Sequence, residues 1–363
     1  MLFTTFAKED DMPPTPNTPD TATAREPEEL REQLRAWLAR ETGDPDLAVS
    51  PPQRTTLGFS RENWFFDAVW KTNGHGDGRT RLVARRDPVG SVLDSDRAVE
   101  AAVLAAVHRT DVPVPALHWV DLDGAEADRP TLVMDRAPGR CEPFVLAGPL
   151  PEAERAALAG KFCEQLAAIH RLDPAALGLG GVLADPGPGA AHVAVAHWDA
   201  ELRKIQQAPE PELEYILAWL TATAPASGAT TLVHGDFKPG NVLIEDGRVT
   251  AVLDWETAHL GDPLEDVGWV TNPLRAREHL IPGVWERDDL IAAWERHTGR
   301  TADRLAVRWW NVLANLKLTV IVMAGQHALA HGRYDRIIQT PTALHRVMLG
   351  LISTYGHERG EHA

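Results

Sequence analysis

The sequence has 363 residues, of which 44% are hydrophobic and 24% charged, and this composition is typical of a globular protein long enough for two lobes. Its formal net charge of −16 argues against nucleic acid or an anionic membrane as the main partner. With two cysteines, no basic leader and no long apolar run, we expect a cytoplasmic protein that has no disulfide framework and spans no membrane.

The amino-terminal region predicts a disordered arm and then an amphipathic helix. Residues 1–25 are rich in Pro, Thr and Asp and contain little that could be buried, which is typical of disorder. Leu30, Leu34, Trp37 and Leu38 then recur at the spacing of one helical face. We therefore expect the folded part of the chain to begin with this helix.

A β-rich region follows and is divided by one helix. Alternating apolar residues predict antiparallel strands, and an Ala-rich stretch that stops before the prolines of DVPVPAL predicts the helix. These elements form the smaller predicted lobe, which ends near a hinge. The strands are expected at 54–57, 63–70, 79–86 and 131–135, the helix at 96–108, the lobe at 26–137 and the hinge near 136–140.

The remainder of the chain has mostly helical patterns and predicts a larger lobe, residues 138–355, followed by a tail at 356–363. A small β-rich lobe followed by a larger helical one predicts an α+β fold with two unequal lobes. The helices are expected at 152–172, 197–222, 263–271, 288–297 and 303–331, with Gly- and Pro-rich loops at 178–191.

The stretch LVHGDFKPGNVLIEDGRVTAVLDWE, residues 232–256, places many polar groups between two apolar runs. Asp246-Gly247 is a strong signal for a two-residue hairpin turn, because both central residues of that turn need a positive φ. Glu245 and Arg248 would then form the first pair of the hairpin.

Counting outward from that pair sets Asn241 opposite Val252 and puts Asp254 at the open end of the hairpin. Two strand residues span about 6.6 Å, so Asn241 and Asp254 can face one ion. The loop HGDFKPG enters at the same end and brings Asp236 and Lys238 with it.

These four side chains have the chemistry of phosphoryl transfer. The oxygens of Asn241 and Asp254 suit Mg²⁺, which prefers hard ligands. Asp236 can orient a hydroxyl group and accept its proton, and Lys238 can neutralise a transferring phosphoryl group. Each residue alone could instead serve a turn or a cap. The ordered set, H-x-D-x4-N, a DG hairpin and an apolar strand ending in Asp, favours catalysis.

This stretch resembles the catalytic core of the aminoglycoside phosphotransferase and choline kinase superfamily, small-molecule relatives of protein kinases. The resemblance extends over about residues 50–330 and implies a bilobal protein-kinase-like fold and an ATP-dependent kinase. It implies that Asp236 is catalytic and that Asn241 and Asp254 hold Mg²⁺. His234 and Asp266 match the residues that brace the catalytic loop in that family.

The resemblance also implies a nucleotide site in the smaller lobe. Gly58 and Ser60 match the family's short Gly-x-Ser loop, although a single glycine between strands can be a plain turn. Arg85 ends the segment LVAR, where many relatives have lysine, so the charge is kept and the geometry changes. Glu100 would anchor this arginine or be a solvated helical acid. Met134 would lie beside adenine at the hinge or pack in the core.

Neighbouring residues have structural interpretations. Arg86 is expected on the face of its strand opposite Arg85. Asp262, Pro263 and Glu265 have the pattern of a helix start, with a cap, a first-turn proline and an acid. The tryptophans at 309–310 are expected to build the core or a wall of the substrate site.

The sequence therefore predicts an ATP- and Mg²⁺-dependent kinase that phosphorylates a hydroxyl group of a small molecule. The alternatives are a pseudokinase that binds nucleotide without turnover and a protein kinase. The second is disfavoured, because residues 255–262 are too few for a peptide-binding activation loop and no A-P-E segment follows.

The identity of the substrate is left open, as is the oligomeric state. TDVPVP (110–115) and VLDWETAHLGDPLEDVGW resemble the branch that includes kinase domains fused to acyl-CoA dehydrogenases. Residues 198–214 lean acidic, as a polycationic aminoglycoside would require, whereas 273–300 balance arginines against acids, as a hydroxyacyl-CoA thioester would require. Helical charge runs are usually solvated faces, however. We expect a neutral or modestly charged hydroxylated metabolite or antibiotic, with polycationic aminoglycosides as poor substrates.

Overall fold

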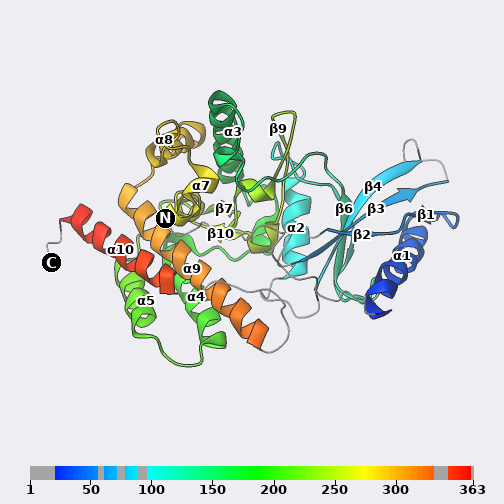
Figure 1. Cartoon of the computed structure of the whole chain (residues 1–363), viewed down its shortest axis with the longest axis horizontal. Helices are drawn as coiled ribbons and strands as arrows, with labels where there is room; N and C mark the ends of the chain where they lie inside the picture. Colours follow the sequence, from blue (N-terminus) through cyan, green and yellow to red (C-terminus); the bar gives the residue numbers. More distant parts are fainter. Residues whose placement is uncertain (1–20, 56–60, 72–77, 89–95, 331–341, 361–363) are drawn as a thin grey trace, which may run out of the picture.

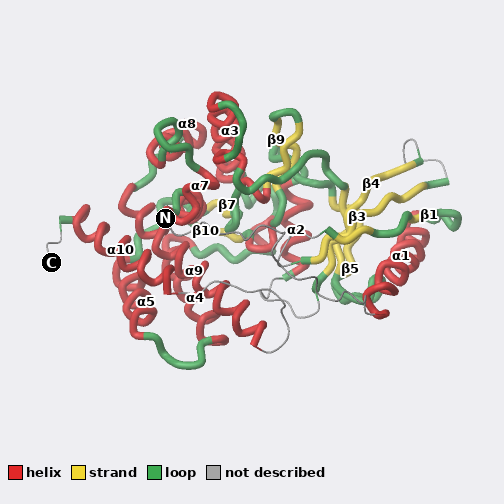
Figure 2. Tube along the Cα trace, viewed as in Figure 1, coloured by secondary structure: helices red, strands yellow, loops and turns green. Residues whose placement is uncertain are grey.

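The computed structural model describes residues 21–55, 61–71, 78–88, 96–330 and 342–360. A smaller lobe built on a β-sheet is joined to a larger lobe made mainly of helices (Figures 1 and 2). This arrangement confirms the α+β fold with two unequal lobes. The predicted boundary between the lobes, at 137–138, falls in the connector after the last strand of the large sheet.

The smaller lobe contains an antiparallel sheet in which β2 pairs with β3 and the other strands follow the order β1-β3-β4-β6-β5. Two predictions need correction. The strand expected at 54–57 ends at Arg54, with residues 56–60 outside the described part. Strand β5 was missed because it is short and irregular, with a register shift between Leu117 and Trp119. The bounds are β1 Ala48–Val49, β2 Gln53–Arg54, β3 Glu62–Val69, β4 Arg79–Arg86, β5 Leu117–Asp121 and β6 Thr131–Asp135.

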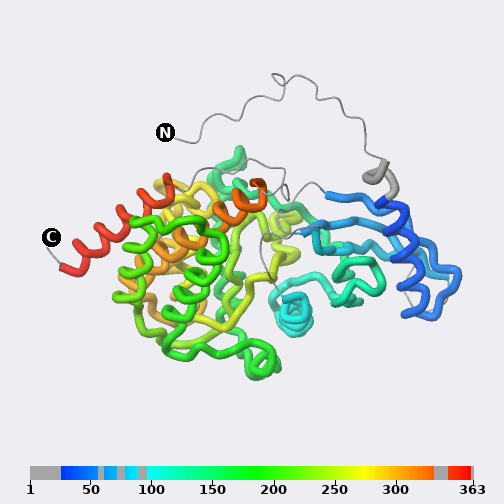
Figure 3. Tube along the Cα trace, turned by 90° about the horizontal axis from the view of Figure 1, so that it is seen from below, coloured from blue at the N-terminus to red at the C-terminus, as the bar shows by residue number. Residues whose placement is uncertain are grey.

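Two helices cover the sheet, one on each face, because successive side chains of a strand point to opposite faces. Helix α1 (Thr21–Thr42) lies on one side of the sheet (Figure 3). Its apolar face packs in one core cluster with Val133 of β6. The β6 neighbours on either side of Val133, Leu132 and Met134, belong instead to the core shared with α2 (Arg97–Val107) and the larger lobe. Helix α2 therefore lies between the sheet and the larger lobe (Figure 1).

The predicted amino-terminal arm overlaps α1 at residues 21–25, and residues 1–20 lie outside the described part of the chain. The apolar positions predicted for this helix, Leu30, Leu34, Trp37 and Leu38, are all buried. Their burial confirms the helical spacing as the signal of a core-facing surface.

The larger lobe is helical, but α7 and α10 were not predicted and one predicted helix needs correction. The helix expected at 197–222 is two helices, α4 and α5, because Pro209 and Pro211 interrupt the pattern and Pro211 opens the second helix. Helix α10 also continues four residues into the predicted tail. The bounds are α3 Glu152–Arg171, α4 Ala190–Ile205, α5 Pro211–Thr223, α6 Leu264–Val270, α7 Ala276–His279, α8 Arg287–Thr298, α9 Arg304–Ala330 and α10 Thr342–Arg359.

Helix α9 is the central helix of this lobe. Within the described residues it is the one helix long and apolar enough to cross a membrane by length and composition, although 61% of its most apolar window is buried inside the protein. It packs against α6 and α10. The approach to α6 is so close that a Cβ at Gly268 would collide with Trp310. Burial in the core accounts for the apolar character of this helix.

Two small antiparallel sheets contain or flank the polar stretch at residues 232–256. β7 (Thr231–Val233) pairs with β10 (His259–Gly261), and β8 (Val242–Glu245) pairs with β9 (Arg248–Val252). The turn between β8 and β9 has the predicted form, because Asp246 and Gly247 both have a positive φ.

The predicted register of this hairpin is wrong by one residue beyond the turn. Glu245 pairs with Arg248 as expected, but a bulge at Thr250 sets Val242, and not Asn241, opposite Val252. Asn241 still lies beside the end of β9, because its backbone carbonyl accepts from the N–H of Leu253 at 2.8 Å. The bulge thus leaves Asn241 one residue from Asp254 across the hairpin.

Candidate active site

The loop that follows β7 is held from behind by a buried carboxylate. Asp266 of α6 accepts hydrogen bonds from the backbone N–H groups of His234 (2.7 Å) and Gly235 (2.9 Å) and contacts Nε2 of His170 at 3.1 Å. Burial alone would raise the pKa of Asp266, but these partners lower it to about 2. The structure thus brings His234 and Asp266 together where the resemblance implies that they support the loop.

The His234 side chain joins the loop to the end of the hairpin. Its Nε2 lies 3.0 Å from the carbonyl oxygen of Leu253, and its Nδ1 accepts from the N–H of Asp236 at 3.2 Å. Burial lowers the pKa of His234 in spite of nearby carboxylates, so the ring is neutral at pH 7. A neutral ring can accept at one nitrogen while it donates at the other, as this geometry requires.

Asp236, Lys238 and Asn241 form one contact group at the front of the loop. The Lys238 ammonium is 2.6 Å from Oδ2 of Asp236. The amide nitrogen of Asn241 donates to the same carboxylate oxygen at 3.1 Å and to the backbone carbonyl of Asp236 at 2.9 Å. The Asp236 carboxylate is partly exposed, at 20%, so it can meet a hydroxyl group that enters from solvent.

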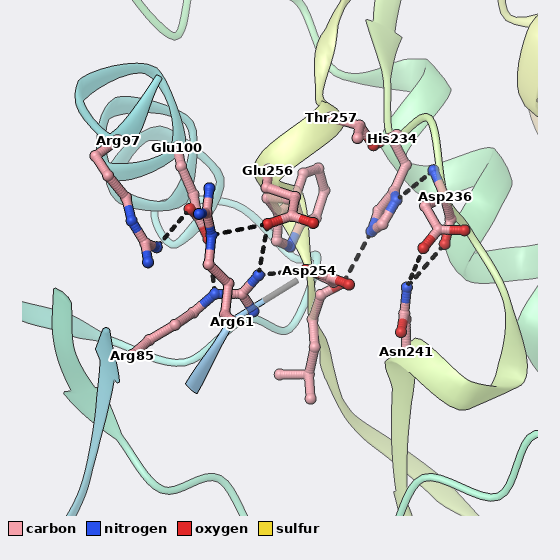
Figure 4. A network of polar contacts seen from close by, with 12 residues as sticks. Arg61, Arg85, Arg97, Glu100, His234, Asp236, Asn241, Asp254, Glu256 and Thr257 are labelled. Carbon is pink, nitrogen blue, oxygen red and sulfur yellow. Dashed lines mark hydrogen bonds and ion pairs between the residues drawn. The ribbon is translucent and has the colours of Figure 1, made fainter. Parts of the chain in front are cut away.

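Asp254 lies between this group and the smaller lobe (Figure 4). Its backbone has a φ of 69°, a left-handed conformation that is uncommon for a residue with a side chain. Such strain is characteristic of functional positions. The side chain is 22% exposed and accepts a hydrogen bond from Arg85, which belongs to β4.

Arg85 is the residue through which the smaller lobe contacts the candidate metal ligand. Its Nε lies 3.1 Å from the buried carboxylate of Glu100, and one terminal nitrogen contacts both Asp254 and Glu256. Burial would lower the pKa of Arg85, but the three carboxylates raise it, so the charge is permanent. Arg86 lies on the opposite face and pairs with Glu26 and Asp128. The predicted strand register is confirmed at this position.

The ion pairs extend to residues that the sequence reasoning missed. Glu256 also contacts Arg61 at 3.0 Å (Figure 4). Arg61 is in turn 3.0 Å from Asp87 of the smaller lobe. Arg97, one turn before Glu100, contacts that carboxylate at 2.8 Å. The position of Glu256, two residues after Asp254 in the same motif, was the available signal. Arg61 offered none, because a charged residue beside a loop is usually solvated.

Of the other predicted nucleotide-site residues, two are not described and one is buried. Gly58 and Ser60 lie outside the described residues. Met134 pairs with Val83 on one side and Leu117 on the other, and its side chain is buried in the large core. Its position gives it a packing role, and contact with adenine stays a prediction.

The helix start at Asp262 differs slightly from the predicted cap. The carboxylate of Asp262 accepts from the N–H of Leu264 at 2.8 Å, but the helix begins one residue later than a simple cap would require. Glu265 contacts His259 at 3.1 Å. Trp309 and Trp310 are buried, so of the two predicted roles the structure shows the packing one.

The donor atoms available for a metal ion are few. The described residues contain no group of three or more His, Cys, Asp or Glu side chains that could hold a metal. The Asn241 nitrogen is used by Asp236, so its oxygen is the atom that can ligate, and Asp254 contributes a carboxylate. Two hard oxygen donors suit Mg²⁺, which usually completes its shell with water and phosphate oxygens.

Comparison with known proteins identifies relatives of this chain. A model of the phosphotransferase enzyme family matches residues 55–310. Acyl-CoA dehydrogenase family member 11 of Rattus norvegicus is 32% identical over 278 residues, which are 72% of this chain and 34% of that protein. Acyl-CoA dehydrogenase family member 10 of Mus musculus is 32% identical over 195 residues, 52% of this chain and 18% of that protein. The chain therefore spans about a third or less of the length of these relatives.

Solved structures share the fold. A protein of Ralstonia eutropha JMP134, described provisionally as an aminoglycoside phosphotransferase, has a TM-score of 0.70 at 22% identity over 90% of this chain and 98% of its own. The macrolide 2'-phosphotransferase MphH of Brachybacterium faecium has a TM-score of 0.55 at 22% identity, covering 83% and 93%. The bilobal architecture is thus that of the protein-kinase-like phosphotransferases.

Proposed function

The chain belongs to the phosphotransferase enzyme family, and from this premise we propose that it transfers the γ-phosphoryl group of ATP to a hydroxyl group of a small molecule with the help of Mg²⁺. The observation that carries the proposal is a pair of neighbouring contact groups. Asp236 contacts Lys238 and Asn241 on one side of Asp254. Arg85 contacts Asp254 on its other side. A base, two oxygen ligands and two cations around one point are the parts of a phosphoryl-transfer site.

In the proposed reaction Asp236 accepts a hydrogen bond from the acceptor hydroxyl and so aims its oxygen at the γ-phosphorus. As the new O–P bond forms, the bond to the ADP oxygen breaks and the hydroxyl proton passes to Asp236. Lys238 and Arg85 stabilise the negative charge on the transferring group and on ADP. Lys238 also keeps the Asp236 carboxylate oriented before the substrate binds.

Asn241 and Asp254 are the side chains that would hold Mg²⁺, which when bound neutralises and orients the phosphate oxygens. In the present structure Asp254 is paired with Arg85. Arg85 can pair with the phosphates instead of Asp254, because the contact of its Nε with Glu100 does not use the donors on its terminal nitrogens. A related fold has been solved as a ternary complex with AMP-PNP and hygromycin B (TM-score 0.51), which supports a nucleotide and a hydroxylated acceptor as the two ligands.

For the acceptor we propose a neutral or modestly charged hydroxylated metabolite or antibiotic. Three of the five acids in the stretch that could have suited a polycation are paired within it, since Arg203 contacts Asp199 and Glu214, and Lys204 contacts Glu201. Paired surface charges attract a ligand weakly. Hydroxyacyl-CoA thioesters, which are strongly anionic, are the alternative class that the names of the acyl-CoA dehydrogenase relatives suggest.

A phosphorylation screen with mass detection tests the proposal. Purified protein, ATP and Mg²⁺ are incubated with amino alcohols, sugars, hydroxyacyl-CoA thioesters, macrolides and aminoglycosides. We expect one class to gain a phosphoryl group, with Asp236→Asn as the inactive control. Efficient phosphorylation of kanamycin-type compounds would refute the proposed acceptor class. Absence of any product, together with saturable ATP binding, would establish the pseudokinase alternative.

A further inference from the structure

The dipeptide before Asp236 is held at all four of its polar backbone groups by side chains. Asp266 accepts from the N–H groups of His234 and Gly235. Thr257 donates its hydroxyl to the carbonyl of His234 at 3.1 Å, and Lys317 of α9 donates to the carbonyl of Gly235. The carbonyl of Gly235 belongs to the peptide bond that leads into Asp236. Whatever fixes this carbonyl therefore also fixes the plane from which the Asp236 side chain departs.

The backbone at Gly235 has a conformation that few residues can adopt, so the hydrogen bonds that fix it are important for the loop. Its φ is +81°, and a Cβ there would lie 2.7 Å from the hydroxyl oxygen of Thr257. Glycine is the residue that adopts such a conformation at least steric cost, but it also gives the unheld chain the most freedom. The loop is therefore ordered by its hydrogen-bond partners and not by its own sequence.

Lys317 is an unusual residue for the interior. It is 6% exposed, and its ammonium lies over the rings of Trp269 (4.8 Å) and Trp198 (5.4 Å). Burial lowers the pKa of Lys317, while the carboxylates of Glu265 and Asp236 act in the opposite direction. An ammonium group is costly to bury, and cation–π contacts recover only part of that cost. A methionine could fill the same space without a charge, so packing alone does not explain a lysine here.

We propose that Lys317 is a positioning residue for phosphoryl transfer, in that its ammonium holds the Gly235–Asp236 peptide and thereby aims the Asp236 carboxylate at the acceptor hydroxyl. The inference rests on the proposed function. The two helices that carry the opposing contacts, α6 with Asp266 and α9 with Lys317, pack directly on each other, and Asn311 of α9 donates to the carbonyl of Gly268 at 2.6 Å. The loop is thus clamped between two mutually fixed helices.

The test is Lys317→Met, which keeps the length and the apolar stem of the side chain and removes its donor. The chain contains a matched control. Lys161 of α3 also donates to a glycine carbonyl, that of Gly247 at 2.5 Å, but does so in the β8–β9 turn. Lys161→Met therefore makes the same chemical change at a contact outside the loop that leads to Asp236.

The first measurement is hydrogen exchange of peptides that cover residues 232–240, which needs no substrate. We expect Lys317→Met to speed the exchange of these amides about tenfold, as loss of a charge-assisted hydrogen bond should, with Lys161→Met leaving them unchanged. The second is steady-state kinetics with Mg-ATP and the best acceptor of the screen. We expect kcat to fall about 10²-fold in Lys317→Met, as misplacement of a reacting group does, with the KM for ATP within about twofold.

Chemical rescue separates positioning from general loss of structure. Lys317→Ala removes the propyl-ammonium portion of the side chain, and added propylammonium should restore kcat at least about tenfold if the donor is what matters. Tetramethylammonium, which has the charge but no N–H, should not. Equal rescue by both cations would overturn the inference, as would a KM increase that accounts for the whole loss of activity.

The exchange experiment also distinguishes failure of this inference from failure of the proposed function. If wild-type protein transfers no phosphoryl group but Lys317→Met alone loosens residues 232–240, the clamp exists and the proposed function is wrong. If the exchange of these residues is the same in wild type and Lys317→Met, the positioning role is refuted whatever the activity.

Discussion

Arg85 in the smaller lobe donates to the carboxylate of Asp254 in the larger lobe, across 169 positions of sequence. The arginine is the residue expected to meet phosphate, and the aspartate is the residue expected to hold the metal ion. Their charges satisfy each other in the structure. Binding of Mg-ATP would replace this pair by two others, arginine with phosphate and aspartate with metal, so the charges stay compensated while the ligands enter.

The first prediction concerns the two neighbouring arginines of β4. Arg85→Ala should lower kcat/KM for ATP about 10–10²-fold, because it removes charged hydrogen bonds to phosphate. Arg86→Ala is the matched control, since that side chain pairs with Glu26 and Asp128 on the other face of the sheet. Steady-state kinetics with varied ATP measures both. A larger loss in Arg86→Ala would show that the phosphates are approached from the opposite face.

The second prediction tests the proton acceptor. Asp236→Asn should lower kcat about 10²–10⁴-fold, because an amide cannot take the hydroxyl proton. The dissociation constant of Mg-ATP, measured by calorimetry, should change little, because Asp236 contacts Lys238 and Asn241 and not Arg85. Turnover near the wild-type rate in Asp236→Asn would remove this residue from the mechanism.

The third prediction separates the two candidate metal ligands. Asp254→Ala should weaken Mg-ATP binding more than Asn241→Ala, because a carboxylate brings a full charge to a divalent cation and an amide brings a dipole. In the absence of metal, Asp254→Ala should bind ATP at least as well as wild type, because Arg85 has lost a competing partner. Calorimetry with Mg²⁺ and with EDTA decides it. Equal losses in both variants would contradict the inferred division of roles.

The fourth prediction is a pH dependence of stability that belongs to Asp266. Its pKa is lowered to about 2 in the folded protein from an ordinary 3.8. A lowered carboxyl pKa stabilises the fold fully above pH 3.8, and the contribution, about 2 kcal/mol, is lost as the pH falls through about 2. The difference in the free energy of unfolding between wild type and Asp266→Asn should therefore be constant near neutral pH and shrink below pH 4.

Urea unfolding at a series of pH values measures this difference. The control is Asp246→Asn, since an asparagine suits the same turn conformation and should leave the pH profile parallel to that of wild type. A gap between wild type and Asp266→Asn that stays constant down to pH 2 would show that the carboxylate is not held in its charged form by the loop amides.

The β8–β9 hairpin shows how far local sequence signals reach. The Asp246-Gly247 turn was predictable because the two residues that must adopt a positive φ are adjacent in the chain. The bulge at Thr250 was not predictable, because this part of the hairpin contacts a segment that is distant in the sequence. The Thr250 hydroxyl donates to the carbonyl of Pro138 at 2.5 Å, and Arg140 pairs with Ile244, so the connector between the lobes reshapes the hairpin.

By itself the sequence determined the elements and motifs whose residues are close together along the chain: the buried face of α1, the helical stretch of α2, and the HGD loop with its following Asn and Asp. Helical and strand periodicity and turn chemistry act over a few residues, so these features can be read without a fold. Only the tertiary structure decided which distant charges meet. Lys317 reaches a carbonyl 82 positions away, and Arg61 reaches Glu256 from the other lobe. Burial gives such pairs their strength, and whether a charge is buried depends on the packing of the whole chain.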